Sequence, residues 1–389
     1  MNIEAIQAAI RAERLDGWLF FDHHQRDPLA YRILQFAPQG IVSRRWYYFI
    51  PAFGEPGKLA HRVEPFTLDA LPGSQRLYSG WREQRTELAR LLGGARRVAM
   101  QYSPHCAIPY VAMVDAGTIE LIRELGVDIA SSADLVQYFE ARWTRQQFEA
   151  HLEAGRRVDE IRRLAFQFIG DALRNRRPVR EWDVQTFIIS QFAARGLVAD
   201  HGPNVSVNAN ASNPHYEPHP DSSAEILPGA VVLIDLWAKL NQPHAVYYDI
   251  TWMGFCGATP PSALENVFDI VREARDRAIR RVQDAAAARE RLRGFQVDDA
   301  ARSYIEERGY GDYFFHRTGH SIGVDVHGTG ANMDNLETHD DRSVIPYTCF
   351  SIEPGIYLGD FGVRSEVNVF VDETSARVTG EKQERLVLI

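Results

Sequence analysis

The chain has 389 residues, of which 45% are hydrophobic, and it carries a net charge of −9 with a pI of about 5.8. This length suggests two domains, and the composition is sufficient for sizeable hydrophobic cores. The acidic balance gives no electrostatic reason to bind nucleic acid or an anionic membrane, so we expect neither as a partner. Three cysteines, none in a Cys-x-x-Cys pair, argue against a disulfide scaffold.

The start of the chain has no basic segment followed by a long apolar core, and no run of about 18 apolar residues occurs anywhere. We therefore expect a cytoplasmic protein.

Residues 1–140 alternate between helix-like and strand-like patterns. Helical periodicity covers 3–15, 82–94 and 118–125, whereas strand-like apolar runs cover 16–22, 46–52, 57–65 and 96–102. This alternation predicts an α/β domain over residues 1–140. His23 and His24 have no acids at ligand spacing, so we interpret them as loop residues.

Long helices are predicted in the second domain, residues 141–389. An amphipathic helix over 145–173 opens it, and a second helix over 180–196 stops at Gly196. A further helical stretch covers 261–309. Its charged, Ala-rich part indicates a solvated helix face rather than a nucleic-acid site.

The first acidic pair, Asp235 and Asp249, flanks a hairpin signal around the turn-prone residues 241–243. Each aspartate is seven positions from Gln242. A hairpin centred there places the two carboxylates opposite one another, with Cβ atoms about 4.5–5.5 Å apart. Carboxylates this close repel, so either a cation lies between them or one stays protonated.

The second acidic pair, Glu353 and Glu366, lies on two strand-like runs joined by a Gly-containing turn. Pro228 precedes Asp235 and Pro346 precedes Glu353 by the same seven positions, each through an apolar run that ends in Ile. This similarity predicts a degenerate internal repeat and two half-domains around a shared centre. Acids near strand ends are common, so either hairpin alone would not indicate a site.

Three histidines, His316, His320 and His327, lie within twelve residues that also hold Gly319 and Gly323. A lone histidine is usually structural. Three of them on a glycine-bearing loop, in a chain that also carries paired acids, favour a functional site.

The order of these motifs resembles the pita-bread metallopeptidases, in the branch of Xaa-Pro dipeptidase (prolidase) and aminopeptidase P. The motifs are the two aspartates, a histidine in Gly-His-x-x-Gly, a glutamate in Ile-Glu-Pro-Gly-Ile-Tyr and a glutamate after Gly-Val-Arg. The resemblance covers roughly residues 145–389. It implies an α+β chain: a C-terminal pita-bread fold of two pseudo-symmetric halves, with a curved antiparallel sheet and outer helices, after an α/β creatinase-type N-terminal domain. It also implies a homodimer.

The resemblance further implies a dinuclear metal site. Asp235 would bind one ion, His320 and Glu353 the other, while Asp249 and Glu366 would bridge the two. One imidazole among oxygen ligands suits Mn²⁺ or Co²⁺, and Zn²⁺ is not excluded.

Catalytic and substrate-binding roles follow from the same resemblance. Glu353 would transfer the proton, and His327 would stabilise the tetrahedral intermediate or bind the substrate carbonyl. His215 and His316 are secondary catalytic candidates, and His215 is also a candidate substrate ligand.

Two arginines could bind a dipeptide's terminal carboxylate. Arg364 could instead hydrogen-bond the metal-bridging glutamate. Arg342 could equally be a solvated surface residue.

The predicted function is a dinuclear hydrolase that cleaves the Xaa-Pro bond of dipeptides or short peptides by attack of a metal-bridging hydroxide. The alternatives are a pseudoenzyme that binds peptides or proteins, and a non-prolyl amide hydrolase of the same fold. Ser321, Gly328 and Ser365 depart from the family's usual pattern, and these departures bear on the substrate more than on the metals.

Overall fold

The computed structural model describes residues 1–38 and 40–389. These residues form two compact units, Met1–Glu140 and Ala141–Ile389. None of the described helices is long and apolar enough to cross a membrane.

The first unit contains a six-stranded mixed sheet with the strand order β4-β3-β2-β1-β5-β6. β1 is antiparallel to β2 and parallel to β5. The strands are β1 (Gly17–Asp22), β2 (Trp46–Pro51), β3 (Gly57–His61), β4 (Ser74–Tyr78), β5 (Arg97–Met100) and β6 (Asp128–Ser131).

Both faces of this sheet are covered. Trp18 and Phe20 of β1 point into one hydrophobic core, whereas Leu19 and Phe21 point into the other. Because side chains alternate along a strand, a continuous apolar run is what a strand buried on both faces requires. The helices are α1 (Ile3–Ala12), α2 (Pro28–Leu34), α3 (Trp81–Leu92), α4 (Ala116–Glu124) and α5 (Ala133–Glu140), with 3-10 turns at Pro104–Cys106 and Pro109–Val111.

The second unit repeats one order of elements, two helices followed by strands. In the first half, the elements are α6 (Arg145–Arg174), α7 (Glu181–Ala194), β7 (Leu197–Val198), β8 (Asn204–Val207), β9 (Val231–Leu240) and β10 (Tyr248–Phe255). In the second half, they are α8 (Ser262–Ala288), α9 (Gly294–Glu307), β11 (Ser321–Ile322), β12 (Cys349–Ile352), β13 (Gly355–Tyr357), β14 (Gly362–Arg364), β15 (Val367–Val371) and β16 (Ala376–Thr379). β17 (Val387–Leu388) joins β10, and short 3-10 turns lie at Asn208–Ser212 and Gly311–Tyr313.

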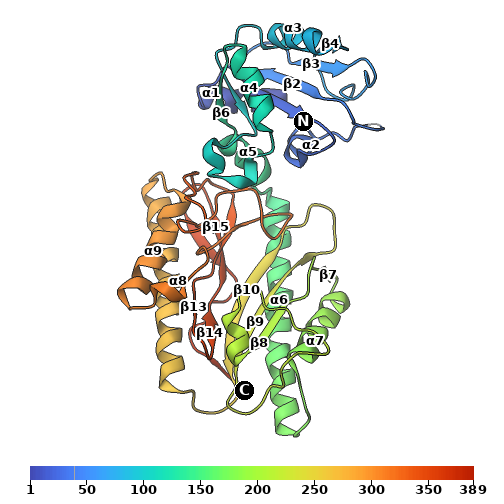
Figure 1. Cartoon of the computed structure of the whole chain (residues 1–389). Coiled ribbons are helices and arrows are strands. Elements are labelled where there is room, and N and C mark those ends of the chain that lie inside the picture. The colour runs from blue at the N-terminus through green and yellow to red at the C-terminus, as the bar shows by residue number, and fades with distance from the viewer. Residues whose placement is uncertain (39) are drawn as a thin grey trace. The chain divides into compact units, whose positions relative to one another are not determined.

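Each half packs its long helix against its own strands. α6 runs along β9 and β10, while α8 packs on α9 and against β12, β14 and β16 (Figure 1). The five-stranded sheet of the first half has the path β17-β10-β9-β7, with β8 on β9, and the second half has β11-β12-β15-β16. This arrangement of two similar halves with outer helices confirms the predicted α+β fold.

The helical stretch predicted over 261–309 is two helices. Arg289 ends α8 in the left-handed region, with φ of 52°. The chain then turns, and α9 begins at Gly294. The predicted helix over 145–173 is found as α6, whose first turn is closed by a capping box between Thr144 and Gln147.

Candidate metal centre

The aspartate hairpin has a different register from the one that we predicted. Asp235 on β9 pairs with Thr251 and Asp249 on β10 pairs with Trp237, so the two aspartates are diagonal neighbours and not directly opposite. The hairpin is centred at Pro243, one residue beyond the predicted Gln242. A shift of one residue in the centre moves the pairing by two, which keeps both carboxylates on the same face.

The glutamate pair lies in the second half, between two ladders of paired strand residues. Ile352 pairs with Val367 in one ladder and Gly355 pairs with Arg364 in the next. Both ladders have the same register, and continuing it places Glu353 directly across from Glu366. The two halves therefore present their acids differently.

His320 immediately precedes β11 and lies beside three of the acids. One ligand atom from each of Asp249, His320 and Glu366 lies within 4.8 Å of the other two. His320 Nε2 is 3.5 Å from Asp249 Oδ2 and 3.4 Å from Glu353 Oε1. The opposite nitrogen, Nδ1, is 3.2 Å from the Ser321 carbonyl. This assigns the proton to Nδ1, which leaves the Nε2 lone pair for a metal.

Two buried carboxylate oxygens in the centre, Asp249 Oδ1 and Glu366 Oε1, have no hydrogen-bond partner among the described residues. Burial raises the pKa of both carboxyls well above their usual range, and repulsion from neighbouring carboxylates raises them further. Burial likewise raises the pKa of Asp235 to about 7. Uncompensated buried carboxylates are costly, whereas divalent cations bind oxygen donors of this kind. The donor set therefore fits divalent metal ions.

Glu353 differs from the other three acids. Burial opposes its ionisation, but the neighbouring side chains of His320, His316 and Arg364 together hold its pKa below the usual value. Ser351 Oγ donates to Glu353 Oε1 at 3.0 Å and accepts from the His320 backbone N–H at 2.9 Å. Ser351 thus orients the glutamate and the histidine together.

The two halves are joined by side chains that cross between them. Arg364, from the second half, forms an ion pair with Asp235 and donates to Thr251 Oγ1 at 3.0 Å. Thr251 in turn donates to Glu366 Oε2 at 2.8 Å. Asn368 exchanges hydrogen bonds with the backbone N–H and carbonyl of Asp249.

The sequence reasoning missed Thr251 and Asn368. Each lies two positions after an acid, Asp249 or Glu366. In a strand that spacing places it on the same face as the acid, and this signal could have identified both.

The other histidines lie in different environments. His327 is exposed and stacks edge-on to His320, with ring centroids 4.4 Å apart. The neighbouring His320 ring, together with the partial desolvation of this site, lowers the pKa of His327 to about 3, and His215 contributes to that shift. His215 is exposed, and its backbone N–H donates to Asn213.

His316 has a neighbour at both ring nitrogens. Nδ1 is 2.7 Å from the Arg317 carbonyl and Nε2 is 2.7 Å from the Tyr357 hydroxyl. Burial lowers the pKa of His316 to about 4. His316 is therefore a neutral, fixed ring at neutral pH.

Both candidate arginines use their donors within the protein. Arg342 is buried, not solvated, and it binds Asp340 through two nitrogens and the Thr329 carbonyl through the third. Arg364 is also buried, and its contact is with Asp235 rather than with the glutamate that we considered. Because these donors are occupied, we assign neither arginine a contact with the substrate.

The residues that depart from the family pattern have structural partners. Ser321 Oγ accepts from the Gly330 backbone N–H at 3.0 Å, and a Cβ on Gly328 would lie 2.9 Å from the same oxygen. Ser321 thus occupies the space that a side chain at position 328 would need. Ser365 accepts a hydrogen bond from the fully buried Arg275 of α8.

Comparison with known proteins adds an independent finding. Residues 149–373 match the model of metallopeptidase family M24. The Xaa-Pro dipeptidase of Lactobacillus delbrueckii subsp. lactis is 33% identical over 221 residues, which cover 56% of this chain and 55% of that protein. The chain spans about half the length of the curated relatives that it matches first.

Solved structures show the same fold. Dipeptidase PepE from Mycobacterium ulcerans has a TM-score of 0.69 at 22% identity, covering 100% of this chain and 96% of its own. X-prolyl aminopeptidase from Caenorhabditis elegans, described as a cytosolic enzyme with a di-nuclear active site, has a TM-score of 0.64 at 15% identity, covering 97% of this chain and 61% of its own. These likenesses support the pita-bread fold.

Proposed function

The chain belongs to metallopeptidase family M24, and we propose that it hydrolyses the Xaa-Pro bond of dipeptides or short peptides at a dinuclear metal centre. The observation that carries the proposal is the pair of buried, unpartnered oxygens on Asp249 and Glu366, beside an imidazole whose Nε2 is available. Buried carboxylates without donors are costly when they lie close to one another, and bound cations would offset that cost. The similarity to Xaa-Pro dipeptidases supports the choice of bond.

We assign the ligands by position. Asp249 and Glu366, each from a different half, would bridge the two ions. His320 and Glu353 would complete one ion's ligands and Asp235 the other's. When bound, two divalent ions lower the pKa of a water molecule between them, so that a nucleophile is present at neutral pH.

Proton transfer is assigned to Glu353. Its lowered pKa keeps it ionised at neutral pH, and Ser351 holds one of its oxygens. An ionised carboxylate can take a proton from the nucleophile and deliver it to the leaving nitrogen.

Substrate contact is assigned to His327 and His215, the two exposed histidines beside the centre. His327 is neutral, so it can donate one N–H to the oxyanion that develops on the substrate carbonyl. His316 already has contacts at both ring nitrogens, and we assign it the role of positioning Tyr357 and the adjacent backbone.

Three finer assignments complete the proposal. The physiological metal is Mn²⁺, because one imidazole and four carboxylates make an oxygen-rich ligand set. The protein works as a cytoplasmic homodimer. The di-nuclear, cytosolic aminopeptidase of Caenorhabditis elegans supports the metal count and the compartment.

The test is proline release from Ala-Pro by protein treated with chelator and then reloaded with Mn²⁺, with the metal-free sample as control. An Ala-Pro-Ala tripeptide separates dipeptidase from aminopeptidase activity, and Ala-Ala tests for a non-prolyl amide hydrolase. Metal-dependent cleavage before proline is the expected result. Binding of Mn²⁺ without any cleavage of these peptides would contradict the proposal and favour a peptide-binding role.

A further inference from the structure

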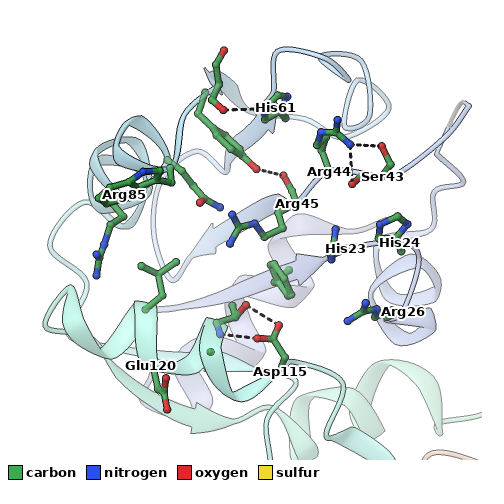
Figure 2. A pocket seen from close by; sticks show the side chains of 18 of the residues that line it. His23, His24, Arg26, Ser43, Arg44, Arg45, His61, Arg85, Asp115 and Glu120 are labelled. Atoms are coloured by element: carbon green, nitrogen blue, oxygen red, sulfur yellow. Dashed lines mark hydrogen bonds between the residues drawn. The ribbon is translucent and has the colours of Figure 1, made fainter.

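A cleft of about 1090 Å³ opens in the first unit, outside the region that matches the family model. It is lined by the loop after β1, the segment before β2, and helices α3 and α4. Figure 2 shows Arg45 projecting into its middle, with His23, His24 and Arg26 to one side and Asp115 across from it on the α4 side. Its size matches small-molecule sites.

The loop after β1 is held by Asp22, which is only 1% exposed. The Asp22 carboxylate accepts the backbone N–H groups of Gln25, Arg26 and Asp27 at 2.9, 2.7 and 3.0 Å, and the Tyr31 hydroxyl at 2.6 Å. These bonds occupy the carboxylate. Asp22 therefore fixes the backbone of Arg26 without neutralising its side chain.

The same loop adopts a costly conformation. His24 and Gln25 both have positive φ, 63° and 56°, which residues with a Cβ rarely adopt. The bonds to Asp22 hold this conformation in place. The loop that carries His23, His24 and Arg26 is thus preorganised along the cleft.

A second carboxylate holds the segment before β2 in a similar way. Glu64 accepts the backbone N–H groups of Ser43 and Arg44, each at 3.0 Å, and the Ser43 hydroxyl at 2.5 Å. The adjacent Arg45 enters the cleft. As with Asp22, the hydrogen bonds to the Glu64 carboxylate come from backbone N–H groups and a hydroxyl, and not from the guanidinium groups of Arg44 and Arg45.

The cleft consequently holds positive charge without a partner. Within the described part of the chain, neither the Arg26 nor the Arg45 side chain has an ion pair or hydrogen bond. By contrast, Arg85 on α3 pairs with Glu124 on α4. His23, His24, Arg26 and Arg45 line the same cleft. Burial lowers the pKa of His23, and the neighbouring His24, Arg26 and Arg45 lower it further, in agreement with that placement.

Asp115 lines the cleft across from this charge, and Glu120 and Glu124 are the other acids of the lining. Asp115 caps α4, where it accepts the Thr118 backbone N–H at 2.9 Å and the Thr118 hydroxyl at 2.8 Å. Its acceptors are therefore directed at its own helix.

We propose that this cleft binds a small molecule through an oxyanion group, phosphate or carboxylate, with Arg45 as the principal ligand and Arg26 and His23 beside it. A guanidinium group matches two oxygens of either anion at once. The exposed ring of Trp81 also lines the cleft and can cover the apolar part of the ligand. This site is separate from the metal centre and does not depend on the proposed peptidase activity.

The experiment is calorimetric titration of the full-length protein with inorganic phosphate and, separately, with acetate, at low ionic strength and constant chloride. We expect saturable binding of at least one anion. Arg45→Gln should weaken it at least about tenfold, because the substitution removes the charge-assisted hydrogen bonds from the guanidinium to the anion. Arg96→Gln is the matched control, since it removes the same charge from an exposed arginine that is not in the cleft lining.

Three results would overturn the proposal. The first is the absence of saturable binding of either anion, and the second is equal affinity in wild type, Arg45→Gln and Arg96→Gln. The third is a change in assembly mass in Arg45→Gln without anion binding to wild type, which would make the cleft an interface between copies. Equal thermal unfolding midpoints establish that Arg45→Gln is folded, and the preferred anion identifies the ligand's chemistry.

Discussion

Both halves of the second unit carry a pair of acids on neighbouring strands, but the strands that carry the two pairs are hydrogen-bonded differently. In the first half, Asp235 and Asp249 are diagonal neighbours on one continuous ladder. In the second half, Glu353 and Glu366 face each other where pairing between the strands is interrupted. The two halves thus share the positions of their acids in the sequence pattern, but the strand residues across from those acids differ between the halves.

The more instructive difference concerns the partner of each acid. Glu353 has its neighbour, the His320 imidazole, within its own half, whereas Asp235 is paired with Arg364 of the other half. Thr251 of the first half likewise donates to Glu366 of the second. The centre therefore depends on contacts between the halves. The substitutions below test residues of the centre, contacts between the halves, and one loop of the second half.

The largest effect is expected for the carboxylates with unpartnered oxygens. Asp249→Asn or Glu366→Gln removes a proposed bridging ligand. Turnover should fall by more than the roughly 10–100-fold that is typical when a residue hydrogen-bonded to a metal ligand is replaced. The metal-free variants should unfold no earlier than wild type, because a buried uncompensated carboxylate is removed.

The measurements for this pair are peptide hydrolysis, metal content and thermal unfolding. Asp312→Asn, an exposed aspartate, is the control. Turnover near the wild-type value in either variant would refute the assigned ligands.

Replacing Arg364, which contacts the other half, should have the next largest effect, a loss of metal affinity. Arg364→Met removes the partner of Asp235 and the donor to Thr251, so metal affinity should fall about 10–100-fold. Arg342→Met is the matched control, because this buried arginine pairs with Asp340 instead. The control should lower stability while the folded protein keeps its metal affinity, measured by Mn²⁺ titration. Equal affinity losses in both variants would contradict the specific role of Arg364.

Acid should weaken a second contact between the halves. His151 of α6 is buried, and its nitrogens lie 2.7 Å from the Tyr247 carbonyl and 2.6 Å from the Thr379 hydroxyl of β16. Burial lowers the pKa of His151 to about 4, below its ordinary value of 6.5. The unfolded state therefore binds more protons between these values, and stability present above pH 6.5 is lost as the pH falls towards 4.

The full loss from this histidine is on the order of 3 kcal/mol. Urea unfolding of wild type and His151→Gln at pH 7 and pH 4.5 measures it. The variant should lose less stability between the two pH values, whereas the exposed control His219→Gln should behave like wild type. An unchanged pH dependence in His151→Gln would rule out this assignment.

The smallest effect is expected in the second half, for the contact between Ser321 and Gly328, two residues that depart from the family pattern. Gly328→Ala places a Cβ 2.9 Å from Ser321 Oγ and should cost about 1–3 kcal/mol. Combining it with Ser321→Gly should recover part of that cost, which a double-mutant cycle of unfolding free energies measures. Gly359→Ala is the control, because a Cβ at that position would have no neighbour within 4 Å among the described residues. Additive costs at positions 321 and 328 would show that the two positions are not coupled.

Much of the fold followed from local pattern. The helix predicted over 145–173 is Arg145–Arg174, because its amphipathic period and its cap lie within one segment. The break at Arg289 was missed, since neither Gly nor Pro marks it and the residue adopts positive φ. The hairpin centre was misplaced by one residue because three adjacent residues, 241–243, are all turn-prone.

The site was predictable only in part. Spacing placed Asp235 and Asp249 on one face, since an error of one residue in the turn preserves the face. The partner of Arg364 was not predictable, because Asp235 lies 129 positions away in the other half. Local sequence carries no signal for such a contact, and only the packing of the two halves creates it.

The most direct test of the account is the number of Mn²⁺ ions bound per chain, counted by calorimetric titration of metal-free protein. The account predicts two ions for wild type and fewer for Glu366→Gln, because this glutamate contributes to both. Wild type that binds no Mn²⁺, or a Glu366→Gln variant that binds as many ions as wild type with equal affinity, would contradict the claim that the two halves jointly form a dinuclear centre.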